Sequence, residues 1–226
     1  MTLRDKLIRR CIGAIVVAAA MLFFPAGTIR WWEGWVYLGI ITIPMVAFSA
    51  YYYKRDPALV ERRMRSKEPV KRQRVIMAVG NGITATALLL PGLDHRFGWS
   101  KSIFGGVPVW LEVLALLLTL AAYLMTMYVM HVNRFAGRTV QVEPEQTVVS
   151  SGPYRFVRHP MYANASLMIL CGPLGLGSYV AIPFCALIIP ILIVRLLNEE
   201  KVLGQGLPGY VEYCRRTKYR LIPYIW

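Results

Sequence analysis

The sequence has 226 residues, of which 56% are hydrophobic, a mean hydropathy of +0.46 and a formal net charge of +14. The apolar residues form long runs and the charges lie between these runs, which is typical of a protein in a lipid bilayer and not of a basic soluble domain. Positive charge beside membrane spans usually reports topology and contact with anionic lipid headgroups. The composition therefore argues against nucleic-acid binding.

Five apolar stretches are long enough to cross a bilayer at about 1.5 Å per residue. The first four are expected at about residues 11–27, 35–53, 75–93 and 107–130. The first could also be a signal peptide, but Pro25-Ala26-Gly27 is a poor cleavage site, so we expect a retained span. The fifth stretch, residues 161–194, is too long for one pass and is interrupted by the Gly- and Pro-rich segment 172–178. Such a segment predicts a turn, and hence a helical hairpin of two short spans.

The basic residues support about six spans, because cytoplasmic loops are enriched in Lys and Arg. With this topology, all but three of the 26 basic residues lie on one side of the membrane. The exceptions are Arg30, Arg96 and Lys101. Both termini are therefore expected in the cytoplasm, at a bacterial inner membrane or, in a eukaryote, at the endoplasmic reticulum. Asp56 followed by Pro57 also predicts a short interfacial helix over residues 56–64.

The sequence thus predicts an all-α fold, a polytopic membrane helical bundle. Residues 1–130 are expected to form four N-terminal transmembrane helices with a basic cytoplasmic loop at 54–74. Residues 131–226 are expected to form a cytoplasmic loop, a helical hairpin at 161–197 and a cytoplasmic C-terminal tail. The four cysteines lack zinc-type spacing and the three histidines are scattered, so neither a structural disulfide nor a metal is expected.

Polar residues suited to a site are concentrated at the two ends of the expected hairpin. The segment GPYRFVRHPMY, residues 152–162, precedes it, and the segment RLLNEEK, residues 195–201, follows its second arm. A hairpin brings its ends together, so the two segments should meet at the inner membrane interface. Carboxylates at this depth are costly and therefore more often functional.

Purely structural roles are the alternative for each of these residues. His159 with Pro160 could be only a helix cap, and Arg195 and Glu199 could form a weak i,i+4 ion pair. Taken together, the arginines, histidine, tyrosines and two carboxylates suit a polar, zwitterionic ligand with an aromatic part. The sequence contains no nucleophile elbow and no Walker A segment, which disfavours hydrolysis by a serine triad and nucleotide binding of the Walker A type.

These motifs resemble the isoprenylcysteine carboxyl methyltransferase family and, more distantly, the phospholipid N-methyltransferases. The resemblance rests on GPYRFVRHPMY, the Gly- and Pro-broken hairpin, RLLNEEK and the closing YVEY and YRLIP segments, and it covers roughly residues 131–226. It implies a membrane-embedded methyltransferase that depends on S-adenosyl-L-methionine and holds this cofactor in the hairpin and tail.

The resemblance also implies roles for individual residues. The catalytic residues would be Arg195, near the reacting groups, and Glu199. The cofactor-binding residues would be Tyr154, Arg158, His159, Tyr162, Glu199, Glu200, Leu221, Ile222 and Pro223. The methyl acceptor would be a lipophilic or small molecule with a carboxylate, amine or thiol group, and the other partners would be membrane lipids, with no nucleic acid and no metal.

Two other functions are compatible with the sequence. NADPH-dependent membrane reductases of the sterol or steroid type share the RHPxY motif and a tyrosine-rich closing turn. The Glu199-Glu200 pair and the short chain favour the methyltransferase. A non-catalytic membrane scaffold or lipid-binding protein is the third possibility, and it predicts that His159→Ala and Glu200→Ala change no cofactor affinity.

Overall fold

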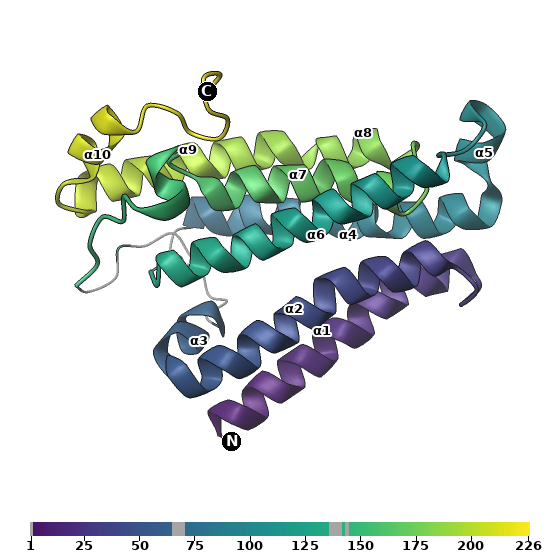
Figure 1. Ribbon diagram of the computed structural model, residues 1–226, viewed down its shortest axis with the longest axis horizontal. Coiled ribbons are helices and arrows are strands. Elements are labelled where there is room, and N and C mark those ends of the chain that lie inside the picture. Colours follow the sequence, from purple (N-terminus) through teal and green to yellow (C-terminus); the bar gives the residue numbers. More distant parts are fainter. Residues whose placement is uncertain (1, 65–70, 136–141, 143–144) are drawn as a thin grey trace.

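The computed structural model describes residues 2–64, 71–135, 142 and 145–226, and the regular structure of these residues is entirely helical (Figure 1). Within them, five helical segments are long and apolar enough to cross a membrane. These are α1 (Leu3–Ala26), α2 (Trp32–Arg55), α4 (Lys71–Phe97), α6 (Val109–Val132) and the continuous pair α8 (Ala181–Ala186) and α9 (Ile188–Gly206). The predicted fold class, an all-α polytopic bundle, is confirmed.

The predicted C-terminal hairpin is present, with bounds that differ from the expected ones. Its first arm, α7 (Pro160–Gly175), has 16 residues and spans about 24 Å, less than the roughly 30 Å of a hydrocarbon core. It is therefore not among the five candidate spans of the described residues, whereas the sequence predicts about six spans. The second arm continues past residue 197 to Gly206, because no proline follows residue 197 before Pro208. Leu207, the residue before this proline, is extended and ends the helix.

The short helices lie near the two ends of the bundle. They are α3 (Pro57–Met64), α5 (Trp99–Phe104), the 3-10 turn η1 (Gly152–Arg155) and α10 (Tyr210–Arg216). Figure 1 shows α3 and α10 towards one end of the long axis and α5 at the other. Helix α3 agrees with the predicted interfacial helix, and the Asp56 carboxylate caps it by accepting a 3.0 Å hydrogen bond from the Leu59 amide. Residues 65–70 of the predicted basic loop lie outside the described residues.

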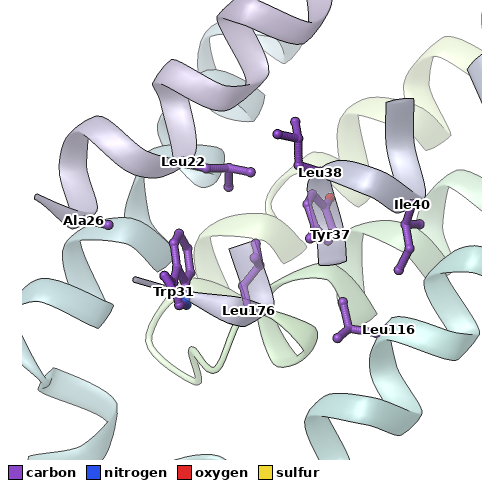
Figure 2. Packing of buried hydrophobic residues seen from close by; sticks show 8 residues of the cluster. All are labelled: Leu22, Ala26, Trp31, Tyr37, Leu38, Ile40, Leu116 and Leu176. Atoms are coloured by element: carbon purple, nitrogen blue, oxygen red, sulfur yellow. The ribbon is translucent and has the colours of Figure 1, made fainter. Parts of the chain in front are cut away.

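A hydrophobic cluster joins the N-terminal helices to the hairpin (Figure 2). Its buried members are Leu22, Ala26, Trp31, Tyr37, Leu38, Ile40, Leu116 and Leu176. Gly92 of α4 allows α1 to approach closely, because a Cβ atom at this position would lie 2.6 Å from the Leu22 carbonyl oxygen. Small residues commonly let membrane helices pack at such short distances.

A buried carboxylate fixes the turn of the hairpin at the end of the bundle that carries α5. Asp94, near the end of α4, is 3% exposed and accepts a 2.8 Å hydrogen bond from the Ser100 amide. The hydroxyls of Ser100 and Ser178 also donate to this carboxylate. Ser178 follows α7, so the node holds the turn between α7 and α8 against α4 and α5. The opposite, open end of the hairpin is thereby positioned.

Candidate functional site

The closing segment of the chain lies beside the start of α7. The amides of Arg158 and His159 donate hydrogen bonds to the carbonyl oxygens of Tyr219 at 2.8 Å and Arg220 at 2.9 Å. Proline at the first helical position then starts α7 directly after His159, because that position requires no amide donor. Segments about sixty residues apart in sequence are therefore joined at the open end of the hairpin.

Glu200 is the centre of an ion-pair cluster at this junction. Its Oε1 atom lies 2.8 Å from Nη1 of Arg158 and 3.3 Å from Nε2 of His159, and its Oε2 atom accepts a 2.9 Å hydrogen bond from Nε of Arg220. The three partners come from the start of the hairpin and from the tail. Glu200 therefore connects α9 to both segments, and protein donors already occupy both of its oxygen atoms.

The neighbouring Glu199 faces a different partner. The hydroxyl of Tyr162 on α7 donates a 2.6 Å hydrogen bond to Oε2 of Glu199 on α9. The Nε group of Arg195, one helical turn before Glu199, donates to the same hydroxyl at 3.1 Å. The two polar segments that were predicted to meet thus lie in contact, with Tyr162 between Arg195 and Glu199.

These residues line a cavity of about 390 Å³. Six of the predicted site residues contribute to its wall: Tyr154, Arg158, His159, Tyr162, Arg195 and Glu199. The apolar part of the wall comes from α4, α7 and α9, at Ile76, Ala165, Ile188, Ile191 and Leu192. The arrangement suits a ligand that has both charged and apolar groups.

The remaining predicted residues lie outside the wall of this cavity. Glu200 is engaged in its ion-pair cluster, and Leu221, Ile222 and Pro223 form a turn in which the Trp226 carbonyl accepts hydrogen bonds from the Leu221 and Ile222 amides. The side chain of Ile222 is 52% exposed. The backbone of the tail bonds to the segment before α7 through Tyr219 and Arg220, immediately before this turn. A direct contact of the turn with a cofactor stays a prediction.

The structure adds wall residues that the sequence did not single out. They are contributed by α3, by α4, by the end of α6 and by α10, and include Arg63, Asn81, Thr84, Asn133, Tyr210 and Tyr213. The YVEY motif, residues 210–213, contains two of them and was a usable signal. The others lie in segments without a motif.

The tyrosines of this wall form a neutral, partly hydrogen-bonded set. Asn133 donates to the hydroxyl of Tyr154 at 3.0 Å, and the hydroxyl of Tyr213 donates to the Tyr154 carbonyl at 2.9 Å. Burial raises the pKa of Tyr154 to about 12 and raises the pKa of Tyr210 well above its usual value. The Tyr210 hydroxyl is buried and has no hydrogen-bond partner in the described part of the chain. It is therefore a neutral donor that remains available to a ligand.

Across the described ranges, no group of three or more His, Cys, Asp or Glu side chains is placed to hold a metal ion.

Part of the chain that lines the cavity is similar to known proteins. Residues 113–205 match the sequence model of the isoprenylcysteine carboxyl methyltransferase (ICMT) family. The cobalt-zinc-cadmium resistance protein CzcN of Cupriavidus metallidurans is 38% identical over 80 residues, which cover 31% of this chain and 33% of CzcN. The mouse Delta(14)-sterol reductase TM7SF2 is 31% identical over 91 residues, which cover 39% of this chain and 22% of the reductase.

The matches cover at most a third of the length of these two relatives. The family match extends from α6 through the hairpin and includes all the predicted site residues except those of the 221–223 turn. The resemblance indicated by the motifs is therefore confirmed for this region: residues 113–205 are similar to the isoprenylcysteine carboxyl methyltransferase family.

Proposed function

We propose that this chain is an integral membrane methyltransferase that uses S-adenosylmethionine and transfers a methyl group to a lipophilic or small acceptor at the inner membrane interface. The family match supports methyltransferase activity in general. The proposed cofactor and its site rest on one observation: Glu199, Tyr162 and Arg195 lie in one cavity at the open end of the hairpin.

The residues of the cavity fit this cofactor. S-adenosylmethionine carries a sulfonium, an amino group, a carboxylate and an aromatic base. Glu199 offers a carboxylate for a positive group, Tyr210 offers a buried hydroxyl without a partner, and Arg63 offers a cation. The volume of about 390 Å³ lies within the range of small-molecule sites.

The task of the protein would be to orient groups rather than to activate them. S-adenosylmethionine supplies an already activated methyl group on a positively charged sulfur. Correct positioning alone contributes about 7–11 kcal/mol in favourable cases. The hydrogen bonds of Tyr162 to Glu199 and Arg195 fix the orientation of both charged side chains in advance. Glu199 would then hold the cationic part of the cofactor.

The acceptor determines whether a base is needed. A carboxylate or thiolate acceptor needs no proton transfer to the protein, whereas an amine must lose one proton. Glu199 is a carboxylate in the cavity wall and would accept this proton at a carboxylate oxygen. The apolar wall from α4 and α9 would contact the hydrocarbon part of a lipophilic acceptor.

The proposed division of the chain follows from the same geometry. Residues 131–226 would form the catalytic region, with the transmembrane helices of residues 1–130 as its support. The excess of basic residues places the open end of the hairpin, and both termini, on the cytoplasmic side in this proposal. The cofactor would then enter from the cytosol and a lipophilic acceptor from the membrane.

A membrane reductase that uses NADPH is the second candidate, and the similarity to the Delta(14)-sterol reductase favours it. The two candidates differ in the cofactor that they bind. Isothermal titration of the purified chain in detergent with S-adenosylmethionine and with NADPH separates them. We expect binding of S-adenosylmethionine alone, and binding of NADPH alone would establish the reductase instead.

The variant Glu199→Gln connects this binding to the site. We expect it to weaken the binding of S-adenosylmethionine by about tenfold or more, because it removes a charge that is partly shielded from water. Glu212→Gln is the matched control, because Glu212 is exposed on α10 and does not line the cavity. Radiolabelled methyl transfer into a lipid and metabolite extract then identifies the acceptor. Equal affinities of the two variants would contradict the proposed site.

A further inference from the structure

Arg63 is a charged residue of the cavity to which neither the motifs nor the family match assigns a role. It belongs to α3, outside the matched residues 113–205. Its Nη2 group lies 3.8 Å from the sulfur of Met161 on α7. Met161 directly precedes Tyr162, so the Arg63 guanidinium reaches the helix that carries the hydrogen bond to Glu199.

The guanidinium of Arg63 has no anionic partner among the described residues. None of the ion pairs found there includes it, and its Nε atom is buried without a hydrogen-bond partner. Burial lowers the pKa of Arg63 from its usual value to about 10, so the group is still charged at neutral pH. A charge that has lost water without gaining a partner is costly, and an anion that enters the cavity would remove this cost.

The other two arginines of the wall are bound differently. Arg158 pairs with Glu200 at 2.8 Å, and Arg195 donates to the Tyr162 hydroxyl at 3.1 Å. Arg63 interacts electrostatically with the phenols of Tyr154 and Tyr123. These phenols are neutral and cannot balance a positive charge. Arg158 thus has an anionic partner and Arg195 a hydroxyl partner, whereas the acceptor found for Arg63 in the described part of the chain is the weakly accepting sulfur of Met161.

We propose that Arg63 is the anion-binding residue of the cavity, where its guanidinium receives a carboxylate or phosphate oxygen of the bound ligand. A guanidinium can present two parallel N–H donors to such a group. The identity of the ligand rests on the proposed methyltransferase function: the anion is either the carboxylate of S-adenosylmethionine or an acidic group of the methyl acceptor. Helix α3 thereby contributes a binding residue from the N-terminal half of the chain.

The two sources of the anion are separated by one set of measurements on the full chain in detergent. Dissociation constants are measured for S-adenosylmethionine and for its decarboxylated form, and KM and kcat are measured for methyl transfer into a lipid extract. The variants are Arg63→Gln and, as control, Arg55→Gln, because Arg55 is exposed at the end of α2 and does not line the cavity.

If the anion belongs to the cofactor, Arg63→Gln weakens the binding of S-adenosylmethionine by about tenfold and leaves the affinity for its decarboxylated form unchanged. If the anion belongs to the acceptor, the variant raises KM for the acceptor by a similar factor, with the cofactor affinity and kcat retained. Arg55→Gln should change none of these values. Unchanged values for Arg63→Gln in both arms would overturn the inference.

Thermal unfolding gives a readout that does not depend on methyl transfer. Without ligand, Arg63→Met should have a higher Tm than the wild type, because it removes an unpaired charge and keeps an apolar chain of similar length. Inorganic phosphate, compared with chloride at equal ionic strength, should raise the Tm of the wild type more than that of Arg63→Met. Failure of the wild type to bind S-adenosylmethionine would contradict the proposed function but not the anion-binding role of Arg63. A lower Tm for Arg63→Met, or equal phosphate shifts, would overturn the role of Arg63.

Discussion

The hydroxyl of Tyr162 donates a 2.6 Å hydrogen bond to the carboxylate of Glu199, although the two residues are 37 positions apart in sequence. Each belongs to a different arm of the C-terminal hairpin, α7 or α9. The contact exists because α7 and α9 are the two arms of one hairpin, whose turn lies at the far end beside Asp94. A polar pair is thereby built into the wall of a cavity.

The Tyr162→Phe variant tests the importance of this contact for catalysis. It removes the donor to Glu199 and the acceptor for Arg195, while the ring that packs at this position remains. We expect kcat for methyl transfer to fall by about tenfold or more, because both charged side chains lose their orientation. Steady-state rates measure this effect, with Tyr224→Phe as the control since Tyr224 is 87% exposed. A rate equal to that of the control would show that the contact has no catalytic role.

Glu200 has a different expected role from its neighbour. Glu200→Ala leaves Arg158 and His159 buried without their acceptor, and we expect a loss of about 3 kcal/mol in the free energy of unfolding. Thermal unfolding in detergent should show a much smaller change for Glu199→Gln. Similar losses in the two variants would mean that both carboxylates serve stability alike.

The hairpin and its convergent ends could be predicted from the sequence. The density of glycine and proline at 172–178 indicates the turn, and a turn requires that the segments on either side of it meet. The separate roles of Glu199 and Glu200 could be anticipated only in part. Adjacent helical residues point about 100° apart, so one faces the cavity and the other does not, but the sequence does not say which.

Arg63 could not be assigned to the site from the sequence, and for Tyr210 the YVEY motif was a signal that gave no position. Arg63 reaches the cavity because α3 folds back from the end of α2 and approaches α7, a contact between segments that share no motif. Tyr210 reaches it because Gly209, with a φ of 81°, reverses the chain after α9. Hydrophobic periodicity predicts which face of a helix is buried, but it does not identify the neighbour against which that face packs.

Two glycines of α4 give a matched test of the packing between α1 and α4. A Cβ atom at Gly92 would lie 2.6 Å from the Leu22 carbonyl oxygen, whereas a Cβ atom at Gly82 meets no atom within 4 Å. We expect Gly92→Ala to lower the free energy of unfolding by about 1–3 kcal/mol through overpacking. Gly82→Ala should be neutral or slightly stabilising, as alanine is the better helix former. Thermal unfolding of both variants measures the difference, and equal effects would contradict the close approach of α1 to α4.

Ser178 provides a test of the node that fixes the hairpin turn. Its hydroxyl donates to Asp94 and accepts a 3.1 Å hydrogen bond from the Ala181 amide at the start of α8. Ser178→Ala should therefore cost about 2 kcal/mol of stability, while Ser102→Ala, at an exposed helix position, should cost little. The affinity for S-adenosylmethionine of the folded Ser178→Ala protein should be retained. A stable variant with lost affinity would show that the node acts on the site and not on the fold.

Tyr210→Phe should lower the affinity for the cofactor without lowering stability, the reverse of the effect expected for Ser178→Ala. The Tyr210 hydroxyl is buried without a partner in the described structure, so its removal should leave the ligand-free Tm unchanged or raise it. The affinity for S-adenosylmethionine should fall by several-fold, since a ligand would lose a hydrogen bond. Titration calorimetry and thermal unfolding of the same preparation give both values. A lower ligand-free Tm with full affinity would assign the hydroxyl to the fold.

The most direct measurement is photochemical crosslinking of radiolabelled S-adenosylmethionine to the purified chain under ultraviolet light, followed by peptide mapping. We expect label in peptides that carry the cavity wall, within residues 154–165 or 188–213, and loss of this label when excess unlabelled cofactor is added. Label confined to α1 or α2, or label that excess cofactor does not displace, would contradict a cofactor site between the arms of the hairpin.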